Sequence, residues 1–217
     1  MNQNKALGVG LGFTAGFVDT VGFVSLFGLF TAHVTGNFVL IGSELARPSH
    51  GVLIKFLAFP SFVLAVALTR MIVIWLERQG KAPLRTLFVV QVSFLTAFML
   101  LGYFALPIQG TDVPIVLLAG MAGAAAMGVQ NAASKLAMND IAPTTVMTGN
   151  VTQLVIDLVD LIRGSTDTAI RGRINKFLWP IIAFGLGAVG GAYAYLYVHF
   201  WALLLPIAIL GWFAATD

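Results

Sequence analysis

A tripeptide that combines a flexible backbone with two hydrogen-bonding side chains occurs twice inside apolar sequence. The copies are Thr35-Gly36-Asn37 and Thr148-Gly149-Asn150, 113 residues apart. Glycine allows unusual backbone angles, while threonine and asparagine can cap a helix start by accepting from its first amides. A helix start also offers unpaired N–H groups and partial positive charge to an anion. Two such starts brought together would bind an anion or a carboxylate, and a purely structural kink is the alternative.

Four more polar residues complete the candidate binding site. They are Asp19, His33, Gln130 and Asn131. A carboxylate inside an apolar span is costly. Asp19 is therefore either a proton-coupling group or cation contact, or a residue hydrogen-bonded to the backbone around the tripeptide. His33 is either a proton relay or ligand contact, or a structural hydrogen-bonding residue. Gln130 and Asn131 place two amides in a helix of small residues, where we expect them to face protein or a cavity.

The composition indicates a membrane protein. Of the 217 residues, 59% are hydrophobic and 10% are charged, against about 25% charged in a typical soluble domain. The net charge of +3 does not indicate nucleic-acid binding, because the basic residues cluster between apolar segments. The chain has no Cys and three His, so we expect no metal site and no cofactor. It lacks the serine-hydrolase, zinc-protease and Walker motifs, and we therefore expect no enzyme.

Six apolar segments are long enough, or nearly so, to cross a bilayer as helices. They cover residues 7–30, 52–76, 84–106, 113–137, 175–198 and 200–216. Two shorter apolar segments, residues 36–46 and 149–162, begin at or just after the start of each tripeptide. The predicted fold class is an all-α polytopic membrane protein.

The basic residues decide how the two short segments are counted. Arg78, Lys81 and Arg85 follow the second long segment, and a second group from Arg163 to Lys176 precedes the fifth. If both short segments cross the bilayer, these groups lie on opposite faces. If both are re-entrant, the groups share the cytoplasmic face with both termini, as the positive-inside rule requires. We predict six transmembrane helices plus two re-entrant half-helices, with eight true spans as the alternative.

The two halves of the chain resemble each other beyond the tripeptides. Residues 15–19 align with 126–131, Thr31 with Thr144, and residues 55–60 with 176–180. We predict two repeats, residues 1–110 and 111–217, in one membrane domain. Each repeat has three crossings, an odd number, so the second is inverted, as in many secondary transporters. Small residues spaced by four, as at Gly8, Gly12 and Gly16, let helices approach closely. They serve either a crossing of the first and fourth spans or a homodimer.

These residues give the chain a family resemblance. Residues 16–19, 33–37, 128–131 and 145–150, followed by Gln153 and Asp157, resemble the YoaK-like bacterial inner-membrane family, a domain of unknown function. The resemblance covers nearly the whole chain. It implies a small, multi-spanning bacterial inner-membrane protein, and it supplies no reaction or substrate.

The predicted function is that of a secondary transporter or channel-like carrier. Its substrate is a small molecule or ion, with an anion favoured, and the site lies at the two half-helix starts near the middle of the bilayer. A non-transporting membrane scaffold or assembly protein is the alternative. A fully packed interior between the two tripeptides would favour the scaffold.

Overall fold

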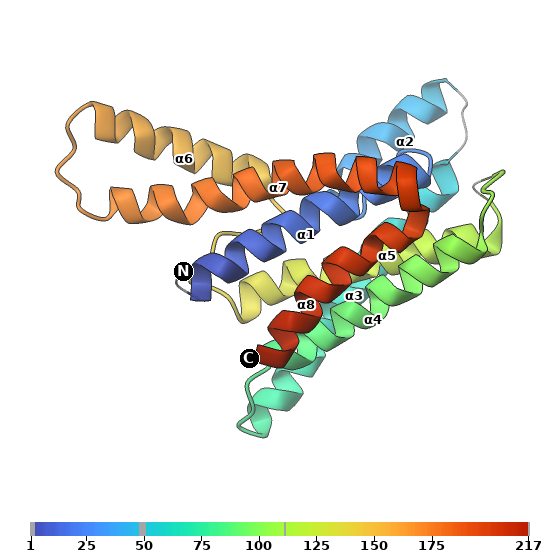
Figure 1. The fold of residues 1–217 in the computed structure, drawn as a ribbon, viewed down its shortest axis with the longest axis horizontal. Helices are drawn as coiled ribbons and strands as arrows, with labels where there is room; N and C mark the ends of the chain where they lie inside the picture. The colour runs from blue at the N-terminus through green and yellow to red at the C-terminus, as the bar shows by residue number, and fades with distance from the viewer. Residues whose placement is uncertain (1–2, 48–50, 111, 217) are drawn as a thin grey trace.

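The computed structural model describes residues 3–47, 51–110 and 112–216, and regular structure in these ranges is helical. Figure 1 shows the long helices running in alternating directions through one bundle, with both ends of the chain at the same end of the molecule. The helices are α1 (Gln3–Ser25), α2 (Gly36–Ala46), α3 (Val52–Arg78), α4 (Leu84–Phe104), α5 (Pro114–Leu136), α6 (Met147–Ile162), α7 (Ile170–Val198), the 3₁₀ turn η1 (His199–Leu203) and α8 (Leu204–Thr216).

Five helical stretches in the described part of the chain are long and apolar enough to cross a membrane. Four are α1, α3, α4 and α5, and the fifth is the 47-residue stretch Ile170–Thr216. That stretch is two helices, because the backbone turns at His199, where φ is 50°, and α8 then runs back along the bundle (Figure 1). At 11 and 16 residues, α2 and α6 are shorter than the roughly 20 residues that a crossing needs.

The first helix ends earlier than its apolar sequence predicts. The apolar run extends to residue 30, but α1 stops at Ser25, and the chain turns at Phe27 and Gly28, where φ is 54° and 78°. The run continues past the helix because the loop itself is buried, with Leu26 and Leu29 fully inaccessible. Hydropathy reports burial and does not distinguish a helix from a loop folded into the bundle.

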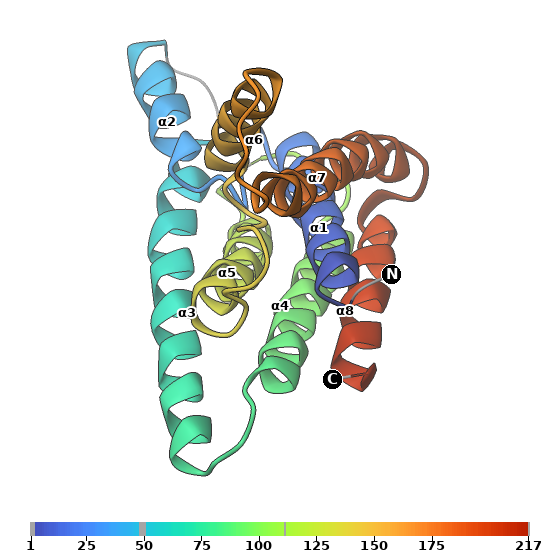
Figure 2. The same ribbon diagram turned by 90° about the vertical axis from the view of Figure 1, so that its left-hand side faces the viewer.

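The helices of the two halves are interlocked. α1 packs most extensively against α7, and α3 packs against α5, so each half contributes its first long helix to a partner in the other half. α1 and α5 make few contacts with each other, so the small faces of the first and fourth spans are not used for a mutual crossing. In Figure 2 five helices follow one another across the bundle, from α3 at one edge through α5, α4 and α1 to α8 at the other, and α7 lies above α1.

Glycines set the distance between α1 and α7. A Cβ atom on Gly16 would collide with the Phe184 carbonyl oxygen, and one on Gly187 would collide with the Phe13 carbonyl oxygen. Gly128 plays the same part between α5 and α3, where a Cβ would lie 2.8 Å from the Phe62 oxygen. Backbone-to-backbone packing of this kind is what small residues permit in membrane helices.

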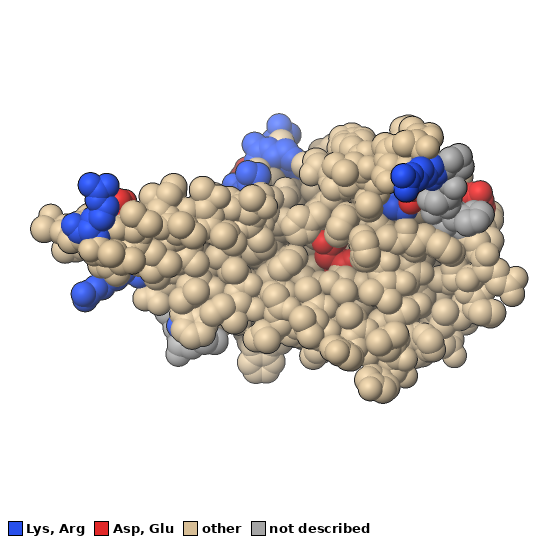
Figure 3. All heavy atoms as spheres, turned by 90° about the horizontal axis from the view of Figure 1, so that it is seen from above, with Lys and Arg blue, Asp and Glu red and all other residues tan. Residues whose placement is uncertain are grey.

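The outer surface is mostly uncharged. On the face drawn in Figure 3, Lys and Arg side chains form separate clusters, with wide surface between them that carries no basic side chain. Long apolar side chains such as Leu64 and Leu186 point outward, 70% and 63% exposed. An apolar belt between charged ends is what a bilayer requires of a protein that crosses it several times.

Substitution of Gly187 by Ala tests the α1–α7 packing. We expect Gly187→Ala to lower stability by about 1–3 kcal/mol, the usual cost of overpacking, because the new methyl group meets backbone that cannot move aside. Gly185→Ala is the matched control on the same helix, since a Cβ there meets nothing within 4 Å. Thermal unfolding in detergent, followed by size-exclusion chromatography, measures both variants. Equal melting of the two would contradict the packing described.

Candidate functional site

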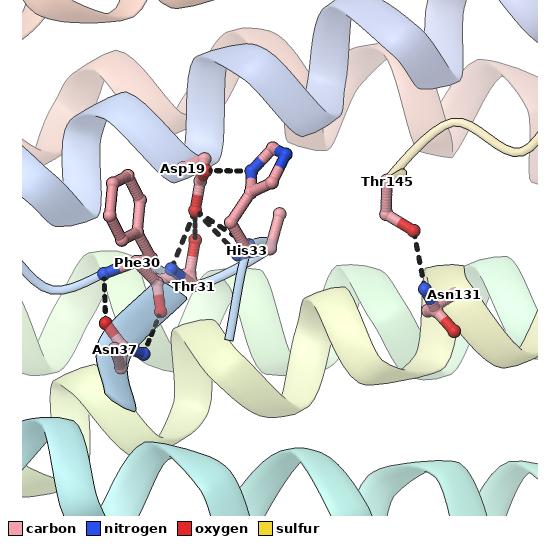
Figure 4. A network of polar contacts seen from close by, with 8 residues as sticks. Asp19, Phe30, Thr31, His33, Asn37, Asn131 and Thr145 are labelled. Atoms are coloured by element: carbon pink, nitrogen blue, oxygen red, sulfur yellow. Dashed lines mark hydrogen bonds and ion pairs between the residues drawn. The ribbon is translucent and has the colours of Figure 1, made fainter. Parts of the chain in front are cut away.

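The loop after α1, residues 26–35 (the first loop), folds back into the bundle and is held by Asp19. Asp19 lies six residues before the end of α1 at Ser25, about 9 Å back along the helix. Its Oδ1 accepts from the amides of Thr31 (2.7 Å), Ala32 (2.7 Å) and His33 (3.4 Å), and its Oδ2 lies 2.7 Å from His33 Nδ1. Figure 4 shows this group of contacts. Asp19 is therefore a positioning residue whose buried side-chain oxygens are hydrogen-bonded by the loop.

The loop after α5, residues 137–146 (the second loop), is held by neutral amides in the same places. Gln130 Nε2 donates to Thr144 Oγ1 at 2.9 Å, and Asn131 Nδ2 donates to Thr145 Oγ1 at 2.7 Å. Both amides come from α5, five or six residues before its end at Leu136. Gln130 also donates to the Leu11 carbonyl and accepts from Gln91, which ties α5 to α1 and α4. The second loop thus returns into the bundle as the first does.

The asparagines of the two tripeptides close these loops. Asn37 Nδ2 donates to the Phe30 carbonyl at 2.8 Å, and Asn150 Nδ2 donates to the Pro143 carbonyl at 2.6 Å. Asn37 also accepts from the Phe30 amide at 2.9 Å, a bond that proline in the second loop cannot make. The prediction that Thr and Asn cap the half-helices is wrong, since neither helix has a side-chain cap. The asparagine side chains hydrogen-bond the buried backbone of the two loops instead.

A cavity of about 320 Å³ lies between the two loops. Its polar lining comes from His33 and Thr35 of the first loop, Asn131 of α5, Thr145 of the second loop and Thr148 of α6. Apolar side chains complete the wall. They are Ala32, Val34, Phe59, Phe62, Val146 and Met147.

Four of the predicted site residues therefore line one cavity, and the other six do not line it. His33, Thr35, Asn131 and Thr148 line the space. The others support or adjoin the loops: Asp19, Gly36, Asn37, Gln130, Gly149 and Asn150. Sequence reasoning missed Thr145 and Phe59, although Thr145 lies three residues before its tripeptide and Phe59 directly precedes a proline inside a helix.

The two half-helix starts differ in what they offer the cavity. The first amides of α2 are already bonded, from Gly36 to the His33 oxygen at 2.8 Å and from Asn37 to the Val34 oxygen at 3.2 Å. The first turn of α6 contributes Met147 and Thr148 to the wall, and no side chain caps it. First-turn amides have no partner inside their own helix, and the residues of this turn lie at the cavity wall.

His33 brings the cavity its titratable group. Its side chain is 36% exposed, and with Nδ1 engaged by Asp19 the second ring nitrogen stays available as an acceptor or, when protonated, as a donor. The edge of the ring packs near Phe184 of α7, with centroids 5.5 Å apart. Among the residues that the structure places, no three His, Cys, Asp or Glu side chains gather as a metal ion would require.

Each half-helix is joined to the next long helix by an ion pair. Glu44 of α2 binds Lys55 of α3, with Oε1 and Nζ 2.7 Å apart, and Lys55 also donates to the Phe27 carbonyl at 2.6 Å. Asp157 of α6 binds Arg173 of α7, with Oδ1 and Nη2 2.9 Å apart. Lys55 and Asp157 are almost completely buried. The 113-residue offset relates the two acids, Glu44 and Asp157, but it takes Lys55 to Thr168, so it could not have identified the basic partner Arg173.

Arg173 also serves the loop before α7. Its Nη1 donates to Asp167 Oδ2 at 3.1 Å. The Ala169 amide and the Arg173 guanidinium together lower the pKa of Asp167 below its usual value. The loop between α6 and α7 thus ends in a charged cluster.

The comparisons with known proteins identify a family for this chain. The model of a family described as "Protein of unknown function (DUF1275)" matches residues 7–216. The UPF0700 transmembrane protein YoaK of Bacillus subtilis (strain 168) is 30% identical over 203 residues, which cover 91% of this chain and 86% of that protein. No solved structure matches significantly. The match spans all the helices and both loops, and the chain therefore belongs to this family of membrane proteins of unknown function.

Proposed function

We propose that the protein is a secondary transporter or channel-like carrier of a small anionic solute, bound in the cavity between the two loops. The observation that carries the proposal is the cavity itself, which lies where the two loops pass between α3, α5 and the start of α6. Its 320 Å³ is at the lower end of the range for small-molecule sites. Irregular backbone at such depth is tolerated where it lines a cavity or is buried in protein.

The lining favours an anion. No Asp or Glu side chain lines the cavity among the described residues, and the Asp19 carboxylate behind it is occupied by loop amides and by His33. The potential donors in its wall include the His33 ring, the hydroxyls of Thr35 and Thr148, and the first turn of α6. A helix start and hydroxyl donors together are a common anion site.

Two inverted repeats account for the arrangement of the helices. Equivalent hydrogen bonds recur with the 113-residue offset, from Asn37 to Phe30 and from Asn150 to Pro143. In Figure 1 the pairs α1 and α5, α2 and α6, α3 and α7, and α4 and α8 each run in opposite directions. We infer six crossings, with α8 the short one, and two re-entrant half-helices that return to the face from which their loops enter.

The charge distribution gives the orientation. The loop between α3 and α4 carries Lys81, and the loop between α6 and α7 carries Arg163. Both lie at the end of the bundle that holds the two termini (Figure 1). The positive-inside rule assigns that end to the cytoplasm, and we infer that the protein resides in the inner, cytoplasmic membrane of a bacterium.

Alternating access in this bundle would involve two interlocked bodies. We define the first body as α1, α6 and α7, and the second body as α2, α3, α4, α5 and α8, because the main packing joins the helices within each set. Sliding the sequence repeats past each other would break the glycine contact of α1 with α7. Each loop instead joins one body to the other, from α1 to α2 and from α5 to α6, and the cavity lies where both loops pass.

The re-entrant count predicts which loops share a face. In right-side-out vesicles, we expect a membrane-impermeant maleimide to label Gly110→Cys and to leave Lys81→Cys and Ser165→Cys unlabelled until the membrane is opened. The chain has no cysteine of its own, so each variant carries one thiol. Labelling of Lys81→Cys and Ser165→Cys from opposite faces would support eight true spans and contradict the re-entrant arrangement.

The anion site predicts specific losses of flux. In proteoliposomes assayed with labelled phosphate, sulfate and short carboxylates, we expect His33→Gln and Thr148→Val to lower uptake about tenfold, roughly the value of one hydrogen bond to a charged group. Thr152→Val is the matched control, because its hydroxyl bonds the Thr148 carbonyl on the exposed side of α6. Uptake that is absent for every anion, or unchanged in folded variants, would contradict the proposal.

Cross-links distinguish interlocked bodies from moving repeats. Pro180 Cγ lies 3.4 Å from the Cβ position of Gly8, so a disulfide between Gly8→Cys and Pro180→Cys joins α1 to α7 within the first body. We expect it to leave flux unchanged relative to the reduced protein. A short bifunctional thiol reagent across Thr35→Cys and Thr148→Cys is expected to abolish flux. Loss of flux with the first cross-link would favour motion of the sequence repeats.

A further inference from the structure

A second cavity, of about 420 Å³, opens near the termini and is separate from the central one. We call it the vestibule. Its wall comes from the start of α1, the second loop and the first part of α7, and its polar and aromatic lining is Asn4, Lys5, Asp140, Asn175, Lys176 and Trp179. The second loop separates the two cavities: Ile141 and Ala142 face the vestibule, and Thr145 and Val146 face the central cavity.

Two ammonium groups of the vestibule are not neutralised. Lys5 Nζ lies 4.2 Å from the centre of the Trp179 ring, and Lys176 Nζ makes a long 3.4 Å bond to the Asn139 carbonyl. Neither forms an ion pair within the described residues. Asp140 also lines the vestibule, so its lining keeps one net positive charge.

The matching position in the first half shows why Lys176 is available. Lys55 donates to the Phe27 carbonyl of the first loop, and Lys176 donates to the Asn139 carbonyl of the second loop. Lys55, however, is buried and paired with Glu44. The carboxylate that corresponds to Glu44 is Asp157, and Arg173 holds it. In the first half, Glu44 pairs with Lys55. In the second half, Arg173 takes the corresponding carboxylate, so Lys176 lines an open pocket without an acidic partner.

We propose that the vestibule binds a phosphate-type oxyanion between Lys5 and Lys176. Two flexible ammonium groups suit a compact, doubly charged oxyanion, and lysine is a common phosphate ligand as a point charge. The Asn175 amide adds a neutral donor, and Trp179 walls the site. The phosphate belongs either to a free solute, for which lysine is a common ligand, or to an anionic lipid headgroup, which basic pockets near the cytoplasmic face bind. This binding step does not depend on transport, so it stands if the central cavity has another role.

Trp179 supplies the readout. In a variant that keeps it as the sole tryptophan (Trp75→Phe, Trp201→Phe and Trp212→Phe), a bound anion that draws Lys5 away changes the emission of the ring. Purified protein in neutral detergent is titrated with sodium phosphate against sodium chloride of equal ionic strength. Isothermal titration calorimetry on the chain without these replacements gives a second measure of the affinity.

Charge variants decide the outcome. We expect Lys5→Gln with Lys176→Gln to weaken binding at least tenfold, Asp140→Asn to strengthen it, and Lys81→Gln, a basic residue at the same end but outside the vestibule, to change nothing. A parallel arm uses phosphatidylcholine vesicles with and without phosphatidylglycerol. Response to free phosphate supports a soluble ligand, and response to phosphatidylglycerol alone supports a headgroup. No response to either, or equal affinity in the double variant, would overturn the proposal whatever the flux assay shows.

Discussion

The constraint on which this structure depends is the satisfaction of backbone polar groups that enter an apolar bundle. Within a bilayer, water is not there to bond the free amides and carbonyls of a loop. The first loop meets this requirement with the Asp19 carboxylate, which gathers three amides, and with Asn37, which bonds both backbone groups of Phe30. In the second loop Asn150 bonds the Pro143 carbonyl, while the Gln130 and Asn131 amides of α5 hold the side-chain hydroxyls of Thr144 and Thr145.

The same constraint places the cavity. Because α1 and α5 carry their polar side chains several residues before their ends, each loop is drawn back to that depth before its half-helix begins. The two loops then approach one another, and the side chains that do not serve the backbone, among them Thr35, Thr148 and His33, face the space between. Within each tripeptide, the asparagine thus bonds the loop backbone and the threonine lines the cavity.

Much of this arrangement follows from local sequence. Apolar runs predicted the long helices within a few residues at most ends, and the repeated tripeptide marked where each half-helix begins. Sequence did not show that Asn37 turns toward Phe30 and away from its own helix, because that choice depends on how deeply the loop is buried. It also did not show the partner of α1. Glycines at every fourth position predict a close neighbour, but which helix supplies it is decided by the shapes of both surfaces, here by the carbonyls of Phe184 and Phe13.

The interlocking of α1 with α7 has a consequence for biogenesis. During synthesis the first helix enters the membrane more than 140 residues before its main partner begins at Ile170, so its glycine face stays uncovered until the chain is nearly complete. Each half of the protein alone lacks the surface that covers its first long helix. Two separately made halves would complete each other only by exchanging these helices, as in a swapped dimer. In the present chain the two halves are covalently joined, and α1 packs on α7 of the other half just as it would in such a dimer.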